Sequence, residues 1–245
     1  MINHYRSRNF FVSSNNILKG MIIANIIIFF ISLLLSGKNT GFSINPFSAL
    51  MPSTKVLNFL GASGTLPIDG FNAWWSLLTA NWLHGSLLHI VFNMIALNAI
   101  CPLVIREFGI FRMFSIYSIT GVAGFFFSYI GGVYITIGAS AGLCGLIGAS
   151  LFFGKSRGGF WGQLVYKQTT GWIISLILIG FFLPNINNWG HAGGLFAGIF
   201  SGWLFGYNEK RLENSFDKAL SILFALATLF FLVRQVIKGF LIVYM

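Results

Sequence analysis

The chain has 245 residues, of which 56% are hydrophobic and only 8% are charged. Soluble globular domains carry about 25% charged residues, and the mean hydropathy here is +0.81. The composition therefore excludes an ordinary soluble domain and indicates a membrane protein with several spans. The net charge of +10 does not indicate a nucleic-acid partner, because the basic residues lie in loops between apolar runs rather than on one compact face.

Seven apolar runs are candidates for helices that cross the roughly 30 Å hydrocarbon core of the lipid bilayer. One of them, 140–154, is shorter than the others and rich in glycine. The sequence therefore predicts an all-α membrane protein, with a bundle of six helices and an added seventh helix. The predicted spans are 18–36, 85–105, 109–131, 140–154, 169–184 with its flanks, 189–206 and 217–238.

The polar segment 1–17 precedes the first run and shows no cleavage site of small residues, so we expect it to remain as a short tail. Most lysines and arginines fall on the same side of the membrane as this tail, and the positive-inside rule assigns that side to the cytoplasm. We expect three parts: the tail 1–17, a core 18–206, and an inner loop with the added helix in 207–245. The small size and the lack of a transit peptide favour the bacterial inner membrane.

The segment 37–83 is predicted to be a long outer loop. It contains three prolines together with Trp74, Trp75 and Trp82. Indole rings prefer the boundary between lipid and water. We therefore expect this loop to lie in the membrane interface rather than to be a disordered linker.

Ser140 stands among small residues in the stretch Gly138–Gly145. A helix from Ser140 to Lys155 would be only about 22 Å long, so Ser140 is expected below the outer surface, at a helix N-terminus that favours a developing negative charge. The loop 131–138 is expected to dip into a water-filled cavity, because irregular backbone is not tolerated against lipid. Taken alone, Ser140 could equally bond to its own helix.

Histidine inside a span is a functional candidate, and His191 shares one helix face with Gly194 and Gly198. Small faces let two helices approach closely. If this face meets the helix of Ser140, the serine and the histidine come within hydrogen-bonding reach, as nucleophilic catalysis requires; otherwise the glycines serve only for packing. Small residues at matching spacing on the earlier helix are Gly138, Gly142, Gly145 and Ala149.

A third group lies in the stretch His84–Asn93. His89 and Asn93 are four residues apart and share a helix face. Both can donate hydrogen bonds toward one point, which suits the stabilisation of an oxyanion. Asn93 could equally join two helices, and His84 is expected near the outer surface, where it would anchor a loop.

The acidic residues limit the chemistry. Asp69 falls in the outer loop and the others fall near the inner side, so no carboxylate is placed to orient His191. A Ser-His-Asp triad is therefore not expected, and a Ser-His dyad is the simplest arrangement. An HExxH zinc motif is absent, and Cys101 and Cys144 are not expected to pair. The other acids are Glu107, Glu209, Glu213 and Asp217.

These residues together resemble the motifs of the rhomboid family of intramembrane serine proteases. The serine motif of the family is matched by Gly138–Gly142, its run of two histidines and an asparagine by His84–Asn93, and its His-x-x-Gly-x-x-x-Gly run by His191–Gly198. The resemblance extends over about residues 18–206 and implies a six-helix core.

The resemblance implies that Ser140 is the nucleophile and His191 the general base, and that His89, Asn93 and the Ser140 backbone N–H form the oxyanion hole. It implies a serine endopeptidase with no cofactor and no metal. Its substrates would be single-pass membrane proteins, cut in or near the transmembrane helix beside a small residue.

Two positions depart from the family pattern. Ala141 follows the nucleophile where glycine is usual, and Ser76 follows Trp75 where arginine is common. The first departure leaves open a catalytically silent relative that binds membrane proteins. A further alternative is a haem protein, since His89 and His191 lie on different spans.

Overall fold

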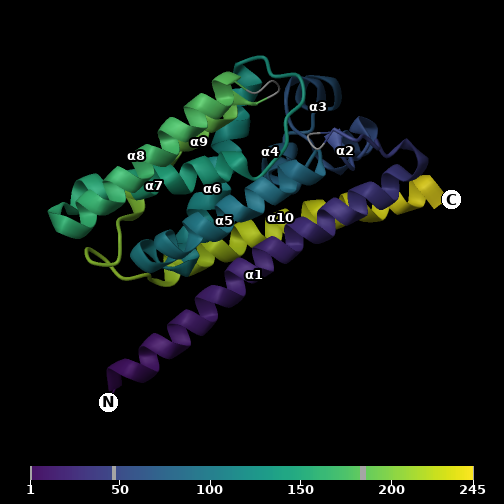
Figure 1. The fold of residues 1–245 in the computed structure, drawn as a ribbon. Coiled ribbons are helices and arrows are strands. Elements are labelled where there is room, and N and C mark those ends of the chain that lie inside the picture. Colours follow the sequence, from purple (N-terminus) through teal and green to yellow (C-terminus); the bar gives the residue numbers. More distant parts are fainter. Residues whose placement is uncertain (1, 46–47, 183–185, 245) are drawn as a thin grey trace.

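The computed structural model describes residues 2–45, 48–182 and 186–244 (Figure 1). Helices dominate these described residues, which confirms the predicted all-α class. The long helices correspond to the predicted spans in the same order, and α1 and α10 lie side by side. They are α1 (Ile2–Ser36), α5 (Leu87–Phe108), α6 (Ile110–Ile130), α7 (Ser140–Arg157), α8 (Gly159–Phe182), α9 (Asn188–Phe205) and α10 (Ser215–Tyr244).

Five helical segments within the described residues are long and apolar enough, by length and composition, to cross a membrane: Asn16–Asn39, Leu87–Phe108, Ile110–Ile130, Gly159–Phe182 and Ser215–Leu241. Helices α7 and α9 are not among them. Helix α7 packs against α5, α6, α8 and α9, so its surface meets protein and a strongly apolar sequence is not required. With 18 residues it is about 27 Å long, longer than the sequence predicts because the helix continues past Lys155 to Arg157.

The contact between α7 and α9 depends on glycine. A Cβ at Gly194 would collide with the carbonyl oxygen of Ala141, and a Cβ at Gly198 would collide with the carbonyl oxygen of Gly145. The two backbones are therefore in direct contact, which confirms the close approach predicted from the spacing of small residues. The face expected on α7 is largely wrong: the Cβ positions of Gly138, Gly142 and Gly145 point at His89, Tyr117 and Thr120 instead. The α7 glycine whose Cβ position points at α9 is Gly148.

The outer segment between α1 and α5 contains short helices. Trp82 is only 7% exposed and packs against Phe114 and Tyr117 of α6, so its ring meets protein and not the boundary between lipid and water. Trp75 stacks on Phe231 of α10 and thereby links this segment to the last helix. The short helices are α2 (Thr54–Leu60), α3 (Thr65–Phe71) and α4 (Ser76–Thr79), with 3-10 turns at Gly37–Asn39 and Ala80–Trp82.

A buried ionic network joins α10 to the core at the C-terminal end of α9. The Arg112 side chain is fully buried and donates to the carbonyl oxygens of Phe205 and Gly206 at the end of α9, at 3.2 and 2.8 Å. Asp217 in α10 pairs with Arg211 at 2.8 Å and lies 3.8 Å from the Arg112 guanidinium. The added helix is therefore fixed to the core by charge as well as by apolar packing.

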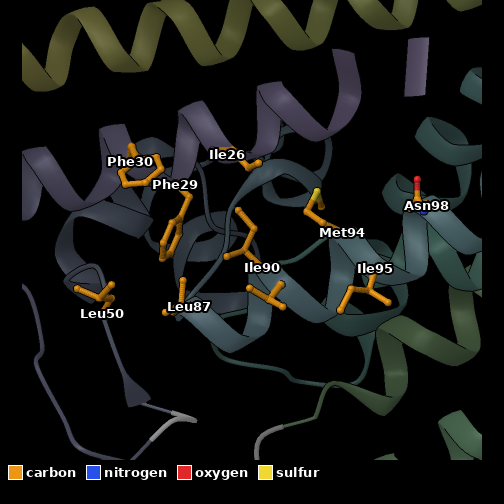
Figure 2. Close-up of a pocket in the computed structure, with 10 residues that line it drawn as sticks. Ile26, Phe29, Phe30, Leu50, Leu87, Ile90, Met94, Ile95 and Asn98 are labelled. Carbon is orange, nitrogen blue, oxygen red and sulfur yellow. The ribbon is translucent and has the colours of Figure 1, made fainter. Parts of the chain in front are cut away.

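An apolar groove of about 550 Å³ runs between α1 and α5 (Figure 2). Phe29 of α1 and Ile90 and Met94 of α5 are among its lining residues. At about 100° per residue, His89 and Asn93 lie on the side of α5 opposite to the lining residues Leu87, Met94 and Asn98. The groove is therefore separate from the candidate site.

Candidate active site

Ser140 and His191 come together at the N-terminal ends of two adjacent helices. Ser140 is the first residue of α7, and His191 lies in the first turn of α9. The Nε2 atom of His191 is 3.0 Å from the Oγ atom of Ser140, and both residues are half-buried. The proximity predicted from the two small-residue faces is confirmed. This geometry is that of a nucleophile and its base.

The backbone before Ser140 is held by protein partners. The Gly138 N–H donates to the carbonyl oxygen of Ala80 at 2.9 Å, and Thr136 and Ser63 exchange two backbone hydrogen bonds at 2.7 and 3.0 Å. The sequence predicts a water-filled cavity around this loop, whereas the structure pairs its backbone with the outer segment. Irregular backbone at membrane depth is tolerated in either surrounding.

His89 points its Nε2 atom at the segment that precedes Ser140. Gly138 has a φ of +123°, and a Cβ there would lie 2.6 Å from this nitrogen, so glycine is required both by conformation and by the approach of the ring. The Gly85 N–H donates to His89 Nδ1 at 3.4 Å. We therefore assign the proton of the neutral ring to Nε2, which makes this nitrogen a donor near Ser140.

Asn93 is buried on the same helix, one turn after His89. Its Nδ2 atom donates to the His89 carbonyl oxygen at 2.8 Å. One N–H of this amide is thus used within α5. The structure places His89 against the segment before Ser140.

His84 lies under His89 and not at the outer surface. Its side chain is fully buried, its ring meets the His89 ring edge to face at 5.1 Å, and neither ring nitrogen has a hydrogen-bond partner among the described residues. Burial, with a smaller effect of His89, holds the pKa of His84 well below its ordinary value of 6.5. His84 therefore packs inside the protein and not in an exposed loop.

No acidic side chain in the described chain contacts His191, whose Nδ1 atom is buried without a partner. The outer acid, Asp69, accepts a hydrogen bond from the Tyr129 hydroxyl at 2.9 Å. The remaining acids bond at the other end of the helices. Glu107 accepts from Trp161 and Glu209 from Arg157. Glu213 accepts from the N-terminus of α6, and Asp217 pairs with Arg211. The arrangement is a pair, as the sequence predicts, and not a triad.

The two departures from the family pattern are accommodated. The Ala141 side chain is 2% exposed and packs with Ala80 and Phe125. The Ser76 hydroxyl donates to the Ser63 hydroxyl at 3.1 Å. Ser76 thus supports the same backbone pair, Ser63 and Thr136, that holds the loop before Ser140.

Asn81 also contacts the start of α7, and the sequence does not single it out. Its Oδ1 atom accepts from the Gly142 N–H at 3.4 Å, so it occupies one of the first-turn donors of α7 that have no partner within the helix. The side chain is 2% exposed. A polar residue in an otherwise apolar stretch was the available signal, but nothing in its spacing connects it to Ser140.

Fold and site define a helical membrane protein with a paired serine and histidine at the ends of two closely packed helices. The sequence profile of the Rhomboid domain matches residues 72–208, which is more than half of the chain. The chain therefore belongs to the rhomboid family, and it is an integral membrane protein.

Several relatives carry the family name. RHOMBOID-like protein 5 of Arabidopsis thaliana is 33% identical over 184 residues, which cover 69% of this chain and 58% of the relative. Rhomboid protease GluP of Bacillus subtilis is 35% identical over 133 residues, covering 52% of this chain and 25% of the relative. RHOMBOID-like protein 1 of Arabidopsis thaliana is 29% identical over 213 residues, with 78% and 55% covered. The chain thus spans less than two thirds of the length of each.

Proposed function

We propose that this protein is an intramembrane serine endopeptidase that cuts membrane proteins in or near their transmembrane helices. The observation that carries the proposal is the 3.0 Å contact between Ser140 Oγ and His191 Nε2. A relative named as a rhomboid protease supports the same conclusion. The six-helix core 18–206 would hold the site, with the part after 207 as an addition.

The proposed chemistry is acyl transfer in two steps. As Ser140 Oγ attacks the substrate carbonyl carbon, His191 Nε2 takes the hydroxyl proton and later delivers it to the leaving amine. Water then attacks the acyl-enzyme, and His191 again acts as the base. Because no carboxylate among the described residues supports His191 Nδ1, the imidazolium is stabilised less than in a triad.

The oxyanion of the tetrahedral intermediate needs donors on the opposite side of the carbonyl. The Ser140 backbone N–H lies in the first turn of α7, where donors have no partner within the helix. His89 Nε2 lies beside Gly138, immediately before this turn. These two groups are the proposed oxyanion hole, and the free N–H of Asn93 adds a third donor.

The substrate is proposed to be a single-pass membrane protein that enters laterally. Residues buried in α8, such as Gly162, Val165 and Thr169, lie in its first half, whereas Phe181 and Phe182 near its end are 82% and 72% exposed. We propose that this outer half of α8 borders the entry. A bound helix must unwind to present a carbonyl, so substrates with helix-weakening residues would be preferred.

We propose that the N-terminal end faces the cytoplasm, since most basic residues fall on that side of the predicted spans. The small size of the chain favours the inner membrane of a bacterium. Ser140 then lies toward the outer surface, and water would reach it from outside the cell.

The proposal is tested by cleavage of a reporter in proteoliposomes. The reporter is a single-pass protein with glycine and a small residue in the outer half of its helix. Wild-type protein is expected to release a fragment, and Ser140→Ala and His191→Ala are expected to release none. Ser150→Ala is the matched control, because its hydroxyl bonds only to Leu146 in its own helix. Cleavage that persists in Ser140→Ala would refute the proposal.

The silent-binder alternative is not favoured by the structure. Its one source of support is Ala141, and the Ala141 methyl is packed in the core with Phe125. The contact between Ser140 and His191 is intact in the presence of this methyl.

A further inference from the structure

Asn187 stands at the junction of the three segments that form the site. It precedes α9 as the N-cap residue, and its Oδ1 atom accepts from the Gly190 N–H at 2.9 Å. Its backbone carbonyl accepts from the His191 N–H at 3.1 Å. Both the side chain and the main chain of Asn187 therefore fix the first turn of α9, in which His191 lies.

The other end of the Asn187 amide reaches two different segments. Its Nδ2 atom donates to the Ser128 hydroxyl of α6 at 2.7 Å and to the Thr136 hydroxyl at 2.6 Å. The Ser128 hydroxyl donates its own proton to the Gly124 carbonyl oxygen at 2.8 Å, so the Ser128 oxygen is left as an acceptor for Asn187. This donor pattern fixes which way the amide is turned.

Thr136 is the link to the nucleophile. It lies four residues before Ser140, in the backbone pair with Ser63. The loop that ends at Ser140 and the helix turn that carries His191 are thus both bonded to one side chain. Ser128 and Thr136 are buried, where hydrogen bonds are hard to exchange for water.

We propose that Asn187 is a positioning residue for the Ser140–His191 pair, holding the start of α9 in register with the loop before Ser140. It touches neither reacting atom. Its effect is geometric, because a displacement of about 1 Å between a nucleophile and its base is enough to cost about a hundredfold in rate. The catalytic part of this inference rests on the proposed function; the structural part does not.

Asn187→Ala removes the cap and both cross-links. Asn187→Asp keeps an oxygen for the Gly190 N–H, since aspartate is among the best N-cap residues. The Thr136 and Ser128 hydroxyls can both turn to donate to its other oxygen, Ser128 by giving up its bond to the Gly124 carbonyl oxygen. Thr136→Val removes one cross-link and leaves the cap. Ser150→Ala again serves as the control for loss of a buried hydroxyl away from the site.

In the reporter assay, Asn187→Ala is expected to lower kcat about tenfold to a hundredfold with KM nearly unchanged. Thr136→Val is expected to show a smaller loss, and Asn187→Asp to recover most of the wild-type kcat. If the variants only folded less well, the loss of activity in each variant would follow its loss of melting temperature. An Asn187→Ala protein with wild-type kcat would overturn the proposal.

Hydrogen exchange provides a second arm that does not need activity. The amides of Gly190 and His191 are expected to exchange about tenfold faster in Asn187→Ala than in wild type, and at the wild-type rate in Asn187→Asp. This arm decides the positioning role even if the wild-type protein cuts no reporter, which would count against the proposed function alone. Unchanged exchange at both amides in Asn187→Ala would overturn the proposal.

Discussion

At the scale of single residues, the site is built from three histidines in three different hydrogen-bonding states. His191 Nε2 forms a hydrogen bond with Ser140 Oγ, and His89 Nδ1 accepts from the Gly85 N–H. Neither ring nitrogen of His84 has a hydrogen-bond partner among the described residues. The first two leave complementary groups at the site, an acceptor for the serine proton and a donor near Gly138. The third contributes its ring to the packing under His89.

His89→Ala removes the Nε2 donor beside Gly138. We expect kcat for reporter cleavage to fall about a hundredfold to a thousandfold, as when one oxyanion donor is lost from a serine protease. Initial rates at saturating reporter measure this change. Asn93→Ala is expected to lower kcat less than His89→Ala does, because one N–H group of Asn93 already bonds within α5. Equal and full activity in both variants would contradict the proposed oxyanion hole.

His84 predicts a dependence of stability on pH. Its pKa in the folded protein lies well below 6.5, so below pH 6.5 the unfolded chain binds a proton that the folded chain does not. Stability is therefore lost as the pH falls from about 6.5 toward the lowered pKa, by at most about 1.4 kcal/mol per pH unit. Melting temperatures between pH 7 and pH 5 measure it.

The control for this pH effect is His84→Phe, which keeps an aromatic ring against His89 and cannot take up a proton. Its melting temperature is expected to fall less steeply on acidification than that of wild type. Parallel curves for the two proteins would show that His84 does not contribute. Other groups titrate in the same range, so the difference between the two curves is the quantity to compare.

At the scale of elements, the position of both reacting groups follows from the backbone contact of α7 with α9. Gly198→Ala places a methyl group against the Gly145 carbonyl oxygen. We expect a loss of about 1–3 kcal/mol, as for other overpacked positions, together with reduced cleavage. The thermal unfolding midpoint in detergent measures the loss.

Gly171→Ala in α8 is the matched control for this substitution. A Cβ at Gly171 meets nothing within 4 Å, and alanine is the better helix former by about 1 kcal/mol. Gly171→Ala is therefore expected to be neutral or stabilising. If both variants lost the same stability, the close contact of α7 and α9 would not be the cause.

The sequence predicts the main features of these elements, because they follow from local rules. The start of α7 at Ser140 and the small face of α9 formed by Gly194 and Gly198 are visible as glycine spacing. The direction of Gly142 toward Tyr117 is not, since spacing alone cannot tell which of several neighbours a glycine meets. The burial of Trp82 and His84 also escapes prediction, because it depends on how the outer segment folds back onto α6 and α5.

At the scale of the whole molecule, the core and the added helix are connected at the inner end by Arg112 and Asp217. Asp217→Asn removes the negative charge between two guanidinium groups. We expect a loss of about 3 kcal/mol, since breaking a buried ion pair leaves a charge without compensation. Thermal unfolding measures the loss, and faster proteolysis of the loop between α9 and α10 is expected with it.

Lys218→Ala, one residue further along α10, is the control for this charge effect. Lys218 is exposed, and exposed substitutions usually change stability by less than about 0.5 kcal/mol. If Asp217→Asn were as stable as Lys218→Ala, the ionic network would not fix α10 to the core.

Labelling of the purified protein with a fluorescent fluorophosphonate would decide whether Ser140 and His191 act as a catalytic pair. Wild type is compared with Ser140→Ala and His191→Ala, with folding confirmed by a thermal transition. An activated serine predicts labelling of the wild type alone, because the reagent reacts with a hydroxyl whose proton a base accepts. Absence of labelling in well-folded wild-type protein, or equal labelling of Ser140→Ala, would contradict the assignment of Ser140 and His191 as the catalytic pair.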